Sequence, residues 1–226
     1  MIPSLYAVTP DTVCLMHAGA RASVFWELDP GTAAEVTATG SASLEKEAWI
    51  HRVLAEQGGC GYSIGAVEES EAIASVLFCA PEDASGTVQL PTAPVSPDAV
   101  LLSSLFIDER FGGIGLEAVL VNAVVLELTR RGVRAVEAFA VRDTAPDAPP
   151  GATGAVEPEV GDDDAFRCLV ARARDVGLLR YAVLESVGFD VIADHELLPR
   201  MRLSLPRAEH LRMEGAEAPT LVTTPG

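Results

Sequence analysis

A glycine-rich turn is the segment of the chain whose residue types are best suited to chemistry. Residues 112–115 read Gly-Gly-Ile-Gly and lie between an apolar segment at 100–106 and a helical segment that begins at Leu116. Glycine allows backbone angles at which successive N–H groups face one ligand, and the start of a helix adds partial positive charge. The turn therefore predicts a site for an anion such as a pyrophosphate, bound without lysine side chains.

The spacing of this turn resembles the cofactor loop of the GNAT family of acetyltransferases, which reads Arg or Gln, two residues, Gly, one residue, then Gly or Ala. Arg110, Gly113 and Gly115 occupy the matching positions. The resemblance extends to residues 184–189, which are similar to the family's late helix ending in Gly-Phe, and to residues 199–205, which are similar to its final strand.

This resemblance implies an α/β sandwich with a central mixed, mostly antiparallel twisted sheet flanked by helices. It also implies acetyl-CoA, or another acyl-CoA, as co-substrate, with the pantetheine arm paired to the strand backbone and the pyrophosphate in the loop. A backbone N–H near Ile107 would polarise the thioester carbonyl. The implied cofactor-binding residues are Leu105, Phe106, Ile107, Arg110, Phe111, Gly112, Gly113, Ile114, Gly115 and Leu116.

Acyl transfer to an amine needs a neutral amine and a proton for the departing thiolate. The resemblance assigns the proton donor to a tyrosine four residues before the late Gly-Phe, where this chain has Leu184. Tyr181, one helical turn earlier, is therefore the candidate acid, although it also fits a core position. Glu137 and Glu27 are the candidate bases, because partial burial raises the pKa of a carboxyl group toward working pH. Each also fits an ordinary paired acid, and deprotonation by water stays open.

The same glycines satisfy a second pattern, Gly-x-Gly-x-x-Ala over residues 113–118, which is typical of a dinucleotide-binding turn with an acidic residue, here Glu137, about 20 residues further on. Charged residues at 108–110 separate the apolar segment from the glycines, which favours acyl-CoA. The alternatives are a GNAT-like acyl-CoA-binding protein with reduced catalysis, a dinucleotide-binding oxidoreductase, and a turn that only packs a helix on a strand.

The glycine turn needs a strand before it and a helix after it. Short apolar runs predict strands, which lie at 23–28, 62–67, 72–79, 100–106, 133–141, 191–193 and 201–205. Apolar residues at helical spacing predict helices, which lie at 44–54, 116–131 and 165–187. The predicted buried face of the central helix consists of Leu116, Val119, Leu120, Ala123, Val124 and Leu128. The strands on either side of this helix are expected to pair in parallel.

The domain organisation follows from the polar segments between these elements. Residues 143–164 are rich in proline, glycine and acidic residues, which predicts a mobile loop near the acceptor entrance. We expect one acyltransferase domain over residues 1–205, of which residues 1–60 are the least well defined, and a C-terminal tail over residues 206–226.

The charge balance excludes several classes of partner. The chain has 33 acidic and 16 basic residues and a formal charge of −17, which repels nucleic acid and anionic membrane surfaces. The expected acceptor is a primary amine on a small molecule or peptide, and a homodimer stays open. The chain shows no run long enough to cross a bilayer and no signal peptide, which predicts a cytoplasmic protein. Isolated histidines and scattered cysteines predict no metal site.

Overall fold

In the computed structural model, residues 3–65, 71–142 and 162–206 are described. Within them, one sheet holds eight strands in the order β1-β2-β3-β4-β5-β8-β7, with β6 paired to β5. The strands are β1 (Ser4–Ala7), β2 (Gly61–Gly65), β3 (Ala74–Cys79), β4 (Ala99–Ile107), β5 (Ala135–Val141), β6 (Leu179–Arg180), β7 (Asp190–Ala193) and β8 (Arg200–Ser204). Residues 143–161 of the expected loop and 207–226 of the expected tail lie outside the described residues.

The sheet is mixed and mostly antiparallel, as expected. Strands β4 and β5 are parallel, as are β5 and β6, while the other neighbouring pairs are antiparallel. A dinucleotide-binding fold is built on a largely parallel sheet. The oxidoreductase alternative therefore does not fit this topology.

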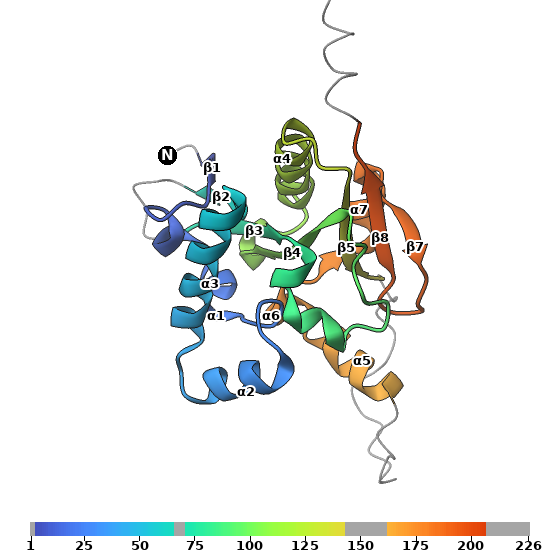
Figure 1. The fold of residues 1–226 in the computed structure, drawn as a ribbon, viewed down its shortest axis with the longest axis horizontal. Helices are drawn as coiled ribbons and strands as arrows, with labels where there is room; N and C mark the ends of the chain where they lie inside the picture. The colour runs from blue at the N-terminus through green and yellow to red at the C-terminus, as the bar shows by residue number, and fades with distance from the viewer. Residues whose placement is uncertain (1–2, 66–70, 143–161, 207–226) are drawn as a thin grey trace, which may run out of the picture.

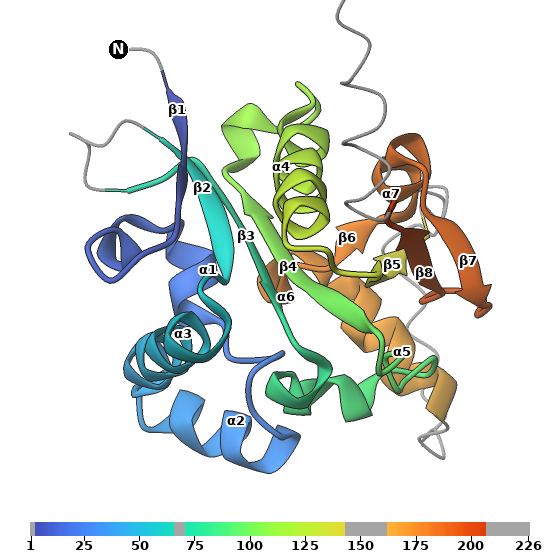
Figure 2. The ribbon, with the colours of Figure 1, turned by 45° about the horizontal axis from the view of Figure 1, so that its top comes forward.

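Helices cover both faces of the sheet (Figures 1 and 2). On one face α4 (Leu116–Arg130) and α7 (Tyr181–Val187) contribute to one apolar core, and on the other α1 (Ala18–Ala22), α3 (Ala42–Gln57) and α6 (Ala173–Val176) contribute to a second core. The remaining α-helices are α2 (Pro30–Ala38) and α5 (Asp162–Ala171). The 3-10 helices are η1 (Val13–Leu15), η2 (Pro81–Asp83), η3 (Ser85–Gln89) and η4 (Glu109–Phe111). Among the described residues, no helix is both long and apolar enough to cross a membrane.

Helix α4 follows the glycine turn at the predicted residue. Its apolar side chains recur at helical spacing, and those of Leu120, Val124 and Leu128 are buried against the sheet. The predicted face was wrong at one edge, because Val119 is 49% exposed and Val121 is fully buried instead. The packed face is thus rotated toward Val121, which belongs to the same core as the α7 residue Leu184.

The N-terminal part departs most from prediction. Residues 23–28 form a turn rather than the expected strand, and their apolar side chains, Trp26 among them, are used for the core. Asp29, directly after these residues, is the N-cap of α2, because its carboxylate accepts hydrogen bonds from the Gly31 and Thr32 N–H groups. Pro30 is then the first helical residue, where its missing N–H costs nothing.

Candidate functional site

Strands β4 and β5 separate next to the glycine turn. They are paired in parallel only from Ala99 to Leu101. Immediately afterwards the register between β3 and β4 shifts, so that Leu77 faces Ser104 while Phe78 faces Leu102. The residue left over on β4 is Ser103, a β-bulge, which bends a strand and increases its twist. The bulge therefore explains why β4 turns away from β5 and opens a gap.

The backbone groups of Leu105 and Ile107 face this gap. Along an antiparallel ladder, the N–H and C=O groups of alternate residues face the partner strand or face away from it. The Asp108 N–H donates to the Ile73 carbonyl on the β3 side at 2.8 Å, so Leu105 and Ile107 face away from β3. The Leu105 N–H accordingly donates to the carbonyl of Gly177 at 2.8 Å. One backbone donor expected to bind pantetheine is thus engaged by the chain itself.

The glycine turn at the end of the gap is open. Gly113 and Gly115 have φ angles of 77° and 88°, which favour glycine, and a Cβ atom at either position would meet nothing within 4 Å. Gly115 is the N-cap of α4, and it has no side chain with which to cap the first N–H groups of the helix. These groups lie at the positive end of the helix dipole, which suits an anion.

A cavity of about 1590 Å³ joins the gap to the glycine turn. Its walls include the end of β4, the glycine turn, α2 and the segment around α6. Four acidic residues and four arginines line it, namely Asp108, Glu109, Glu117, Asp175, Arg142, Arg172, Arg174 and Arg180. The whole chain has 33 acidic and 16 basic residues. The cavity is thus locally balanced in charge, which reduces the repulsion that a polyanionic ligand would meet.

Arg110, expected at the pyrophosphate, is engaged elsewhere. Its side chain is 79% exposed and forms an ion pair with Asp108. Hydrogen bonds from the Arg110 side chain and backbone lower the pKa of Asp108 to about 2. Arg110 is not among the residues that line the cavity.

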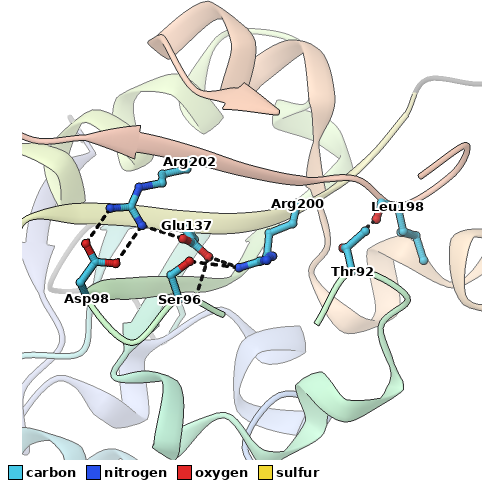
Figure 3. Close-up of polar contacts among 7 residues, drawn as sticks. All are labelled: Thr92, Ser96, Asp98, Glu137, Leu198, Arg200 and Arg202. Carbon is cyan, nitrogen blue, oxygen red and sulfur yellow. Dashed lines mark hydrogen bonds and ion pairs between the residues drawn. The ribbon is translucent and has the colours of Figure 1, made fainter. Parts of the chain in front are cut away.

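Glu137 lies at the end of β5 that pairs with β4, among Ser96, Arg200 and Arg202 (Figure 3), and it does not line the cavity. It is fully buried and accepts hydrogen bonds from Arg200, from Arg202 at 2.8 Å and from the Ser96 N–H at 3.0 Å. Burial acts to raise the pKa of Glu137, but the hydrogen bonds from Ser96 and Arg202 and the charge of Arg200 outweigh it, so the pKa is lowered. A carboxylate held in this way is a poor base, and its position is structural: it ties β8 and the segment before β4 to β5.

Glu27 is also buried and lies in the turn before α2. One of its carboxylate oxygens is 2.5 Å from the ammonium of Lys46, and the other has no hydrogen-bond partner among the described residues. Glu27 does not line the cavity. The structure therefore does not bring the two candidate bases together.

Tyr181 is the first residue of α7, and its ring packs against the Arg142 guanidinium at 4.8 Å. Its neighbours Arg180 and Val183 line the cavity, but Tyr181 does not. Leu184, at the position expected for the family's tyrosine, is fully buried in the core that contains α4. Neither side chain offers a proton to the cavity in this arrangement.

His17 is a cavity residue for which the sequence held no signal. It precedes α1, and its ring stacks on Phe106 of β4 with 5.9 Å between centroids. Its backbone N–H donates to the Ser75 hydroxyl at 3.0 Å, and its Nδ1 accepts from the Gly19 N–H at 3.1 Å. The neutral ring therefore carries its proton on Nε2, which is left to donate toward a ligand.

The surroundings of His17 keep the ring neutral near pH 7. Burial lowers its pKa, and the opposing effects of Glu71 and Asp108 do not restore the ordinary value. Only the folded chain could identify this residue, because the cavity joins segments that are far apart in sequence.

No protein-family model matches the chain, and no curated protein matches it in sequence. Several solved structures match it in fold. A provisionally named acetyltransferase from Acinetobacter baylyi ADP1 is 11% identical, with the match covering 92% of this chain and 95% of that one, and has a TM-score of 0.51. The PaiA N-acetyltransferase from Thermoplasma acidophilum in complex with coenzyme A is 10% identical, with coverage of 90% and 99% and a TM-score of 0.49. At these identities the similarity concerns the fold.

Proposed function

We propose that this chain, which has the fold of the GNAT acetyltransferases, is an acyl-CoA-dependent N-acyltransferase, most simply an acetyltransferase. The observation that carries the proposal is the gap opened by the Ser103 bulge, which leads within one cavity to the uncapped start of α4. An extended arm ending in a pyrophosphate matches that combination, because the gap offers backbone groups and the helix start offers positive charge.

The proposal gives the strand, the glycine turn and His17 separate roles. By this proposal the backbone groups of Leu105 and Ile107 pair with the pantetheine arm, and residues 112–116 surround the pyrophosphate. The acceptor is proposed to be a primary amine, which attacks the thioester carbonyl carbon as a neutral nucleophile. The carbon–sulfur bond then breaks and releases CoA as its thiolate, and the proton lost by the amine passes through solvent water to that thiolate. The Nε2–H of His17 can donate a hydrogen bond to the oxygen that becomes negative during the attack.

A second candidate function is a GNAT-like acyl-CoA-binding protein with little catalysis. The specific observation in its favour is the core position of Leu184, together with the absence of Glu27, Glu137 and Tyr181 from the cavity lining. The two candidates share the binding step and differ only in turnover.

Calorimetric titration of acetyl-CoA, CoA and NADH into the purified protein tests the shared step. Binding of the CoA species alone supports both candidates, while failure of CoA to bind, or preference for NADH, rejects both. Turnover of acetyl-CoA with a panel of polyamines, amino sugars and peptide N-termini then separates them, because the binding protein would release no CoA with any acceptor.

A further inference from the structure

Residues 174–180, called the strap below, lie across the gap between β4 and β5. On one side the strap ends in β6, which pairs with the end of β5. On the other side the carbonyl of Gly177 accepts the Leu105 N–H. Gly177 lies so close to Phe106 that a Cβ atom would come within 2.6 Å of its ring. The strap therefore bridges the two strands where the pantetheine arm is proposed to lie.

Two ion pairs attach the strap to both sides of the glycine turn. Arg174 lies 2.8 Å from the carboxylate of Glu109 in η4, just before the turn. Arg180 lies 3.7 Å from the carboxylate of Glu117, in the first turn of α4 just after it. All four side chains line the cavity. The two arginines are thus held on either side of the proposed pyrophosphate site.

The ion pair between Arg174 and Glu109 is suited to exchange because of its exposure, and the ion pair between Arg180 and Glu117 because of its length of 3.7 Å, although the Glu117 side chain is only 18% exposed. The Arg174 and Glu109 side chains are 86% and 81% exposed, and water screens a pair of this kind so that it adds little stability. Each phosphate of the CoA pyrophosphate can accept two parallel hydrogen bonds from a guanidinium, and the pyrophosphate as a whole carries two negative charges where a carboxylate carries one. A chain with a formal charge of −17 also needs local cations to hold a polyanion.

We propose that Arg174 and Arg180 pair with the phosphates of acyl-CoA, and that Glu109 and Glu117 hold them until the cofactor arrives. The inference rests on the proposed function and assigns it two binding residues outside the glycine turn. It also explains how the site compensates for Arg110, which does not line the cavity.

The test is calorimetric titration of CoA into the full chain and four single variants in low-salt buffer. Arg174→Gln and Arg180→Gln should each weaken binding about fivefold, the size expected for one exposed charge contact. Glu109→Gln and Glu117→Gln should strengthen binding by a similar factor, because each removes a negative charge that repels the phosphates and competes with them for an arginine. All four effects should shrink in high salt.

The matched control is the Arg131–Glu127 ion pair, at 2.8 Å on the far part of the same helix and beside a different cavity. Arg131→Gln and Glu127→Gln should leave the Kd for CoA unchanged. Unchanged binding in the Arg174 and Arg180 variants, or weaker binding in the Glu109 and Glu117 variants, overturns the inference alone. Failure of the unaltered protein to bind CoA overturns the proposed function and the inference with it.

Discussion

At the scale of single residues, His17 provides the sharpest test of chemistry. His17→Ala should lower turnover about 100-fold, the typical effect of losing one donor to a developing oxyanion. The Kd for CoA should stay the same, since CoA lacks the acyl group whose carbonyl oxygen His17 is proposed to contact. Steady-state kinetics with the best amine of the panel, together with calorimetry, measures both quantities. His51→Ala, at an exposed position on α3, is the control, and full activity in the His17 variant would exclude the assigned role.

Substitution of Glu137 tests the stability of the fold rather than catalysis. Glu137→Gln should lower the free energy of unfolding by about 3 kcal/mol, because Arg200 and Arg202 lose the buried charge that they share. The folded state lowers the pKa of Glu137 from 4.5, so the carboxylate stabilises the fold above that pH and ceases to do so as the pH falls through the lower, folded value.

Thermal unfolding of the unaltered protein and of the Glu137→Gln variant across a pH series checks this prediction. The difference in Tm between them should be largest near neutral pH and should shrink in acid. A difference that stays constant down to low pH would mean that the charge of Glu137 is not what stabilises this region.

At the scale of elements, the strand, turn, helix and strand around the glycines could be predicted from the sequence to within a residue or two. Apolar periodicity and glycine position are local signals, and β4, α4 and β5 depend on them. The bulge at Ser103 could not be predicted, because it is defined by the register with β3. The strand predicted at 23–28 was wrong, because a short run of apolar residues can be buried in the core either as a strand or as an irregular turn, and its sequence does not distinguish the two.

Two glycine-to-valine substitutions test whether the glycine turn belongs to the CoA site. Gly113→Val and Gly132→Val, at the two ends of α4, both place a branched residue at a φ angle in the left-handed region, 77° and 74°, with no atom within 4 Å. Both should destabilise the fold by about 1–2 kcal/mol. Only Gly113→Val should weaken CoA binding, and equal affinity in the two folded variants would remove the turn from the site.

At the scale of the whole molecule, the single-domain organisation is a prediction that unfolding can test. Both tryptophans, Trp26 and Trp49, belong to the core on the α3 side of the sheet, whereas the α4 core lies on the other side and contains neither. Since the two cores share one sheet, tryptophan fluorescence and far-ultraviolet circular dichroism should report the same denaturant midpoint. Two separated midpoints would show that the faces unfold independently.

The hydrogen bond between Leu105 and Gly177 has a kinetic consequence. One N–H cannot serve both the strap and a bound pantetheine arm, so this contact must open before the arm can pair with β4. The observed rate of CoA association should then rise with CoA concentration and level off at the rate at which the strap opens. In the free protein, the Leu105 amide proton should exchange with solvent no faster than that opening allows.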